Sequence, residues 1–313
     1  MGIYYVNQNS RSYWHERLYD KMNSLQKAEN VVLRDINRAY DRAFDEIERE
    51  LNNFYAKYAT DNNITFNEAR QRLTPIEARE YRQRIEELRA VYEATEDEYI
   101  LREMAQLSSR KEVTRYQSLL DSINAKLIEM SDNVQVEIEG HLTRTYTQGY
   151  DDSLEAIGVD KKVINHRAIE EVIRYPYAGA MFSDRVWRNK QQLLNWINDD
   201  LTKAMVRGDS IKKMTQSLRD RCSVAKYQAE RLVRTESCNA FTQGTLHGYE
   251  DSKVVDAYEV MSAGDNRTCS SCSSHNGEVV ALSEARAGDN LPPYHPNCRC
   301  CIAPVVIEVG RKH

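Results

Sequence analysis

Residues 31–58 read VVLRDINRAYDRAFDEIERELNNFYAKY, and this stretch decides the fold class. Its apolar side chains recur every three or four residues, which is the spacing of one face of an α-helix. They are Val32, Ile36, Ala39, Ala43, Ile47, Leu51, Phe54 and Tyr58. Charged and amide side chains fill most of the other positions, so the stretch predicts a long helix with one apolar stripe and a wide solvated face.

The same helical character extends over residues 1–157. From residue 3 to residue 139 there is no glycine, and Pro75 is the one proline, so helix-breaking residues are almost absent. After the first helix we expect two more, at about 75–108 and 111–156. Long helices with polar flanks pair as hairpins or bundles, and we expect such an extended helical region here.

Two short sequences in this region are typical of helix starts. Thr65 is followed three residues later by Glu68, and Thr74 is followed at the same distance by Glu77. In such a capping box the threonine side chain accepts a backbone hydrogen bond, and the glutamate accepts one from the threonine N–H. We therefore expect helices to begin directly after Thr65 and Thr74.

Residues 158–250 differ from the preceding part, because glycine, proline and tryptophan appear and the predicted helices shorten. One helix is expected to begin at Ser183 or Asp184 and to end at Gly208, since glycine commonly follows the last helical turn. A second helix is expected to begin at Asp209, and a separate third helix to follow it. This range therefore predicts a compact basic helical domain.

After residue 250 the apolar period switches from three or four residues to two, which is typical of β-strands. Strands are expected at about 254–260, 278–282 and 302–309. The third contains Pro304, which has no N–H to donate to a neighbour, so this strand is expected at an edge of the sheet. Residues 251–313 thus predict a small β module.

The expected fold is mainly α, and α+β overall, because a small sheet follows the helices along the chain. It has three consecutive parts. They are an extended helical region of hairpins or a bundle at 1–157, a compact basic helical domain at 158–250, and the β module at 251–313.

The β module contains a cluster of metal-binding residue types. Cys269 and Cys272 form a C-x-x-C turn, and His295 and Cys298 repeat that spacing. Such turns direct two donors at one point, as a tetrahedral zinc ion requires. Cys300 is the rival of Cys298 as fourth ligand, and the sequence leaves this choice open. A closed four-ligand site of this kind predicts a structural zinc ion.

Other interpretations of these cysteines stay open. Five of the seven cysteines lie between residues 269 and 301, and in a reducing cytoplasm this density favours metal over disulfides. The alternatives are a redox pair, disulfides formed after release from the cell, and a relic site that no longer holds metal. Cys222 and Cys238 stand apart on predicted helices, where core packing is expected of them.

One ion pair is predicted to join the parts. Arg234 and Glu236 lie on the helix that precedes the strands. A buried interaction between an arginine and a glutamate on this helix would clamp the helical domain to the β module. The alternative is salt bridging at the surface.

The charge is distributed unevenly along the chain. The net charge is −5, yet residues 161–234 hold 16 basic and 8 acidic residues. Clustered cations of this kind are typical of phosphate contacts, and the alternative is an ordinary solvated helix face. The candidate DNA-binding residues are Lys161, Lys162, Arg185, Arg188, Lys190, Lys212, Lys213, Arg219 and Arg221.

Sequence motifs of common enzymes and of export are absent. There is no phosphate-binding G-x-x-x-x-G-K-[ST] loop, no G-x-S-x-G elbow and no H-E-x-x-H pair, so we assign no catalytic residue and expect no enzyme. The N-terminal residues lack the basic and apolar regions of a secretory signal, and no apolar run reaches the roughly 20 residues that span a bilayer. We expect synthesis in a cytoplasm and no membrane anchor.

Five motifs occur in an order that resembles a known family. They are Phe182-Ser183-Asp184-Arg185-Val186-Trp187, Gly208-Asp209-Ser210, Arg231-Leu232-Val233-Arg234-Thr235-Glu236, Asp265-Asn266-Arg267-Thr268-Cys269-Ser270-Ser271-Cys272 and Pro293-Tyr294-His295-Pro296-Asn297-Cys298-Arg299-Cys300. Together they resemble the phage head-morphogenesis family, the minor head proteins related to protein F of phage Mu. The resemblance covers about residues 160–306.

This resemblance implies a low-copy component inside the phage head, assembled in the host cytoplasm. Such proteins associate with the portal protein during head morphogenesis, and some contact double-stranded DNA during packaging or ejection. Scaffold and major capsid proteins are further partners that the resemblance suggests. Two alternatives stay open. One is a zinc-dependent nuclease or toxin-like enzyme built on the Cys/His module, with His275 and Glu278 as its acid–base pair. The other is a bacterial helical scaffold that shares the module.

Overall fold

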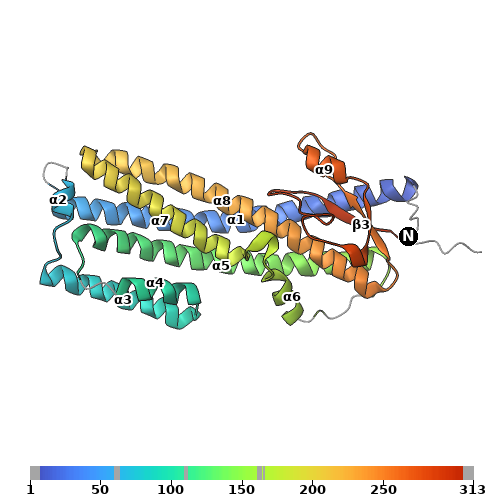
Figure 1. Cartoon of the computed structure of the whole chain (residues 1–313), viewed down its shortest axis with the longest axis horizontal. Helices are drawn as coiled ribbons and strands as arrows, with labels where there is room; N and C mark the ends of the chain where they lie inside the picture. The colour runs from blue at the N-terminus through green and yellow to red at the C-terminus, as the bar shows by residue number, and fades with distance from the viewer. Residues whose placement is uncertain (1–7, 60–63, 109–111, 161–163, 165, 306–313) are drawn as a thin grey trace, which may run out of the picture. The chain divides into compact units, whose positions relative to one another are not determined.

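The computed structural model describes residues 8–59, 64–108, 112–160, 164 and 166–305. Long helices make up most of these residues, and a three-stranded antiparallel sheet lies near the C-terminal end of the chain (Figure 1). The predicted fold class, mainly α with a small C-terminal β module, is therefore confirmed. No helix in the described ranges combines the length and the apolar character that a membrane span requires.

The α-helices, 3-10 helices (η) and strands follow one another along the chain. They are α1 (Gln8–Tyr58), α2 (Phe66–Ala69), α3 (Pro75–Thr95), α4 (Glu98–Ser108), α5 (Arg115–Ala156), α6 (His166–Ile173), η1 (Tyr177–Gly179), α7 (Phe182–Arg207), α8 (Ile211–Ser252), β1 (Ala257–Met261), α9 (Ser270–His275), β2 (Val279–Ala281), η2 (Leu282–Glu284) and β3 (Cys301–Val305).

The chain divides into two compact units. One, the sheet unit, comprises residues 1–34, 136–185 and 229–313, and the other, the helical unit, comprises residues 35–135 and 186–228. Four helices, α1, α5, α7 and α8, continue from one unit into the other. Each unit therefore contains segments from more than one of the three consecutive parts expected from the sequence. The division of the chain into those three parts stays a prediction.

Several predicted helix ends are confirmed. Thr65 and Glu68 form a complete capping box at the start of α2, and Thr74 and Glu77 form another at the start of α3. Gly208 follows α7 with a positive φ of 70°, as its predicted place after the last turn requires. Local sequence is sufficient at these positions because each cap is made by residues no more than three positions apart.

Three predictions about the helices are wrong. The helix expected at 75–108 is two helices, because Glu96 adopts a left-handed φ of 53° and the Asp97 carboxylate accepts the first N–H groups of α4. Helix α7 begins at Phe182, and Asp184 accepts the N–H of Met181 from inside the helix rather than serving as its cap. The two helices expected after Asp209 are one, α8, which runs unbroken for 42 residues.

In the sheet unit, α5 and α8 cross at glycines. A Cβ on Gly244 would lie 2.1 Å from the backbone oxygen of Tyr146, and one on Gly149 would lie 2.3 Å from that of Phe241. Gly248, one turn further along α8, is equally enclosed by α5. Real Cβ atoms do not approach other atoms to such distances, so the two backbones meet only because these positions lack side chains.

Polar contacts lie on both sides of this crossing. The Tyr150 hydroxyl donates to the Asp251 carboxylate at 2.7 Å, and the buried His141 Nε2 lies 2.8 Å from the Ser237 hydroxyl. Burial lowers the pKa of His141 to about 4, so its ring is neutral at physiological pH. The crossing thus combines close backbone contact with satisfied polar groups along one helix pair.

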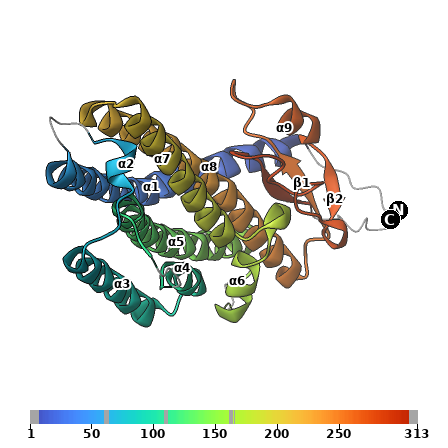
Figure 2. The same cartoon turned by 60° about the vertical axis from the view of Figure 1, so that its left-hand side comes forward.

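The sheet has the order β2-β1-β3, and both pairs are antiparallel. Tyr258 in β1 lies opposite Val280 in β2 and opposite Pro304 in β3. The predicted edge position of Pro304 is confirmed, because β3 has a neighbour on one side among the described strands. Figures 1 and 2 show the sheet and α9 beside the C-terminal half of α8, and the core between them includes Leu246, Tyr249, Val260 and Ile302.

The helical unit has its own core. Trp187 in α7 packs with Leu88, Ile100 and Ile128, and its indole N–H donates to the Gln135 side chain at 2.7 Å. This arrangement joins α3, α4, α5 and α7 through one large aromatic side chain, which loses its exposed area and keeps its hydrogen bond.

The glycine crossing makes a stability prediction. The substitution Gly244→Ala is expected to lower the free energy of unfolding by about 3 kcal/mol or more, because the added methyl meets backbone atoms that cannot move alone. Gly140→Ala, in the partner helix α5, is the control, since its Cβ would meet only the flexible end of Arg144 at 3.4 Å. This control is expected to gain about 0.5–1 kcal/mol of helix propensity. Equal effects in urea unfolding would contradict the close crossing.

Candidate metal centre

The first pair of cysteines is positioned by a turn and a short helix. After β1, the Asp265 carboxylate accepts the N–H of Arg267 at 3.0 Å, which closes the turn directly before the pair. Cys269 then caps α9, and its Sγ accepts the N–H of Cys272 at 3.4 Å. The C-x-x-C spacing therefore brings both sulfurs to the first turn of one helix.

The second pair lies on the loop that leads into β3. Cys298 donates its N–H to the carbonyl of His295 at 3.1 Å, so this pair also forms a tight turn. Asn297, between them, has a left-handed φ of 62°, and its N–H donates to the Thr235 hydroxyl of α8 at 3.1 Å. The Tyr177 hydroxyl donates to the Pro293 carbonyl at 2.6 Å. These contacts dock the loop on α8 and on η1.

The two pairs meet in space. The His295 Nε2 atom lies 3.1 Å from the sulfur of Cys269 and 3.0 Å from that of Cys272. The sulfurs of Cys272 and Cys298 lie 3.8 Å apart. The donor atoms form two groups, each within 4.8 Å, which are Cys269, Cys272 and His295, and Cys272, Cys298 and Cys300. All five predicted ligands are thus brought together.

The chemistry of these donors fits zinc. A tetrahedral ion with zinc–sulfur bonds of about 2.3 Å separates its sulfurs by about 3.8 Å, which is the distance between Cys272 and Cys298. The other ring nitrogen of His295, Nδ1, lies 2.8 Å from the Pro296 carbonyl, to which it can only donate. That bond leaves the lone pair on Nε2, the atom that faces the sulfurs. The residues present could therefore hold a zinc ion.

The choice between Cys298 and Cys300 stays open in the structure. Both sulfurs belong to the same group with Cys272, and neither belongs to the group of Cys269 and His295. Both side chains are buried, at 3% and 1% exposure. A single set of four donors is therefore not singled out by geometry.

The thiols influence one another's protonation. Hydrogen bonds from Cys238 and Cys300 lower the pKa of Cys298 to about 2, so this sulfur is the thiolate of the buried group. Burial raises the pKa of Cys272 to about 12, and the interaction with the Cys298 thiolate together with burial raises the pKa of Cys300. For His295, burial opposes protonation, but the hydrogen bond with Pro296 and the neighbouring cysteines raise its pKa on balance.

An arginine–aspartate pair links the two halves of the site. Arg299, between the two cysteines of the second half, donates to both oxygens of Asp265 at 2.6 and 2.7 Å. The guanidinium holds the pKa of Asp265 well below its usual range. This two-point contact fixes the turn before Cys269 against the loop that carries Cys298.

Residues 195–303 match the family model described as Phage Mu protein F like protein. The predicted resemblance to this family is thereby confirmed over residues 195–303. The matched segment, called here the Mu F like segment, contains the end of α7, all of α8, the sheet up to Ala303 and every donor of the cluster.

Comparison with curated proteins gives one further likeness. Over 206 residues the chain is 27% identical to an NAD(+)–arginine ADP-ribosyltransferase, EFV, of Enterococcus faecalis strain ATCC 700802 / V583. The aligned part is 64% of this chain and 39% of that relative, so the chain spans about two fifths of the relative's length. No solved structure matches the chain.

The Mu F like segment holds one more thiol that the sequence analysis did not assign to the site. Cys238 was expected to serve core packing, yet its thiol donates to the Cys300 carbonyl at 3.5 Å and packs with Cys272, Cys298 and Cys300. Cys238 follows Thr235, whose hydroxyl accepts the N–H of Asn297, by nearly one helical turn, so both lie on the face of α8 that meets the loop. Cys301, by contrast, lies in a separate core beside Leu18, away from the donors.

The two residues predicted as a structural pair bind other partners. The Glu236 carboxylate pairs with Arg185 of α7 at 2.5 Å. Arg234 lies 2.9 Å from Glu230 and 3.6 Å from Glu29 of α1. Both interactions tie α8 to other helices of the sheet unit, and the clamp between helices and β module stays a prediction.

Most of the predicted DNA-binding cations in the described chain are paired with carboxylates. Lys190 is buried against Glu103 at 2.8 Å, and Arg219 lies 3.1 Å from Glu48. Arg185, Lys213 and Arg221 pair in the same way with Glu236, Asp209 and Asp200. Arg188 and Lys212 are exposed and have no ion pair to a described carboxylate, and Lys161 and Lys162 lie outside the described residues.

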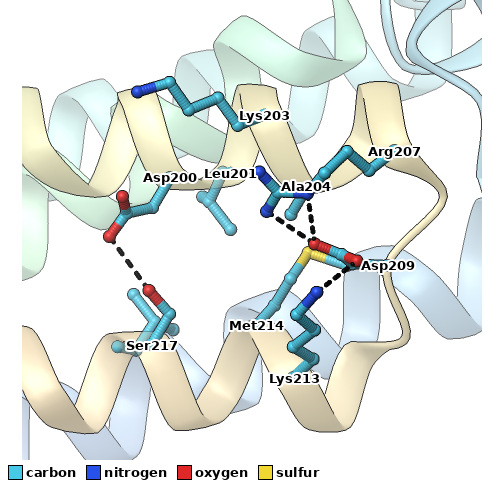
Figure 3. A pocket seen from close by; sticks show the side chains of 10 residues that line it. Asp200, Leu201, Lys203, Ala204, Arg207, Asp209, Lys213, Met214 and Ser217 are labelled. Carbon is cyan, nitrogen blue, oxygen red and sulfur yellow. Dashed lines mark hydrogen bonds and ion pairs between the residues drawn. The ribbon is translucent and has the colours of Figure 1, made fainter.

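A small cavity lies at the turn between α7 and α8 in the helical unit. Its volume is about 150 Å³. Figure 3 shows Arg207 and Lys213 directed at the Asp209 carboxylate, and Asp200 bonded to Ser217. Because these charges already neutralise one another, the cavity offers no unpaired group for a charged ligand.

The Glu29 carboxylate predicts a pH dependence of stability. Burial raises its pKa from 4.5 to about 7, while Arg234 lowers it and Glu230 raises it. A raised acid pKa gives stability that is full below pH 4.5 and is lost as the pH rises through 7. Glu29→Gln removes this loss, so its stability relative to the wild type is expected to rise by up to about 3 kcal/mol between pH 4.5 and pH 8.

The control for this experiment is Glu16→Gln, an exposed position on the same helix. Urea unfolding of both variants at the two pH values measures the effect. A difference between wild type and Glu29→Gln that stays constant with pH would show that this carboxylate titrates normally.

Proposed function

We propose that this chain is a minor head protein of a phage, which associates with the portal inside the head and takes part in head morphogenesis. The observation that carries the proposal is the family match over residues 195–303. That match includes helix α8, on which the loop before β3 packs, and all the donors of the cluster. It therefore covers a folded segment rather than an isolated motif. Residence in the virion follows from the same proposal.

We propose further that the cluster holds structural zinc. A sheet of three short strands is too small to support itself, and natural modules of this size commonly rely on a metal or disulfides. When bound, the ion would join the start of α9 to the loop before β3. Its donors are mostly buried and four or more in number, which favours a closed site over a catalytic one with an open position.

A DNA contact is a finer part of the proposal. Because most basic residues of 161–234 that are described pair with carboxylates, they contribute little to phosphate binding. Arg188 and Lys212 are the described candidates that are exposed and have no ion pair to a described carboxylate. Contact with DNA during packaging or ejection therefore depends on Arg188, on Lys212 and on residues other than the nine candidates.

Copurification tests the portal and zinc proposals together. The full chain is coexpressed with a tagged portal protein from the same phage genome, and the zinc content of the eluate is measured. Retention on the portal with at least one zinc per chain is expected. A portal that elutes alone would contradict the association, and a zinc-free chain would contradict the structural ion.

Two histidine variants make the zinc measurement specific. His295→Ala removes a donor and is expected to lower the zinc content. His275→Ala is the matched control, because His275 lies on α9 close to the cluster but belongs to neither donor group. It stacks on Tyr294 and pairs with Glu278 at 2.7 Å, so its loss leaves the metal donors intact.

A second candidate function, a toxin-like enzyme, is favoured by the likeness to the ADP-ribosyltransferase. Incubation of the chain with labelled NAD⁺ and an arginine-rich peptide tests it. No transfer of label is expected, because the likeness covers a minor part of that relative and the family match favours a head component. The Enterococcus faecalis relative serves as positive control, and labelling by this chain at a comparable rate would overturn the preference for a head protein.

A further inference from the structure

The cluster contains more donors than one zinc ion uses. A tetrahedral ion takes four ligands, whereas six soft donors lie together here. They are the sulfurs of Cys238, Cys269, Cys272, Cys298 and Cys300 and the Nε2 atom of His295. Four of the five cysteine side chains are buried, with exposures of 1–5%. A single ion would leave two buried thiols beside it without a ligand role.

The donors fall into two groups that share a sulfur. Cys272 belongs both to the group with Cys269 and His295 and to the group with Cys298 and Cys300. A thiolate shared in this way can bridge two ions. Cys298 lies 3.8 Å from Cys272, at the separation of two sulfurs on one tetrahedral zinc, but it belongs to the second group alone. It becomes the second bridge when its side chain turns toward Cys269 and His295.

The number of donors matches two ions. Two tetrahedral ions need eight ligand positions, and six donors supply eight when two of them bridge. Cys269 and His295 then complete the first ion, and Cys300 and Cys238 complete the second. Cys238 packs with Cys298, and its sulfur lies 3.5 Å from the Cys300 carbonyl oxygen. It belongs to neither donor group, so its side chain has to turn toward the second ion.

The charges also balance. The first divalent ion with three thiolates and a neutral imidazole carries a net charge of −1. A second divalent ion adds two positive charges, and the thiolates of Cys300 and Cys238 add two negative charges. The net charge of the site therefore stays at −1. Each thiol releases its proton to solvent as it binds. The buried site therefore gains a second ion without an added net charge, which burial would penalise.

We propose that the module binds a pair of zinc ions bridged by Cys272 and Cys298, the second of them held to α8 by Cys238. This inference rests on the proposed structural zinc site and adds a second ion to it. Its structural consequence is that metal binding fastens the β module to helix α8. Cys238 is the donor that comes from this helix, whereas the other five donors lie within residues 269–300.

Metal stoichiometry tests the pair. The full chain is purified with zinc and its metal content is measured after removal of loosely bound ions. Two zinc ions per chain are expected for the wild type and one for Cys238→Ser. Cys222→Ser and Cys301→Ser are the matched controls, because both remove a buried cysteine that does not pack in the cysteine cluster with Cys238, and both are expected to keep two.

The outcomes separate this inference from the proposed function. One zinc in the wild type would overturn the pair and leave the structural zinc site in place, and no zinc would overturn both. Cadmium-113 NMR of the substituted wild-type chain gives a second readout that does not depend on any variant. Two resonances of equal intensity support the bridged pair, and a single resonance at full loading contradicts it.

Discussion

In the sheet unit, α5 and α8 approach so closely that a backbone oxygen of one helix occupies the space that a side chain would need on the other. Gly149, Gly244 and Gly248 permit this approach. The close approach of α5 fixes the rotation of α8 about its own axis, because α5 can come this near only to the face of α8 that carries Gly244 and Gly248. Every other partner of α8 then meets a defined face. Ser237 meets His141 of α5, Glu236 meets Arg185 of α7, and Thr235 meets the loop before β3.

The β module depends on that orientation of α8 in turn. Its three strands are short, and much of its chain is turn and loop, so apolar burial alone offers it limited stability. The module compensates with three kinds of link. Arg299 binds Asp265 and so joins the turn before Cys269 to the loop that carries Cys298. The Asn297 N–H donates to Thr235 of α8. The cysteines of the module pack on Cys238 of α8. Two of these links end on α8, which explains why a buried helix carries a threonine and a cysteine nearly one turn apart.

The sequence predicted those features that are encoded by residues close together in the chain. The capping boxes at Thr65 and Thr74, the positive φ at Gly208 and the two cysteine pairs each depend on a few neighbouring positions. The break at Glu96 was missed because neither glycine nor proline marks it, and the continuity of α8 was missed because polar residues within it resemble a boundary. Cys238 and the ion pairs of the basic stretch lie beyond local patterns, since their partners are tens to more than a hundred residues away.

These long-range pairings change what the basic stretch can do. A run of lysines and arginines predicts phosphate binding only when its charges face solvent unpaired. Here Lys190 is inside the helical unit, and Arg185 belongs to the frame that holds α8. Part of the positive charge in this stretch therefore joins helices, through partners such as Glu103 and Glu48 from distant parts of the chain, and part pairs locally, as Lys213 does with Asp209. A carboxylate beside each of these cations competes with phosphate for it, so the charge count of residues 161–234 overstates the positive charge that they offer to DNA.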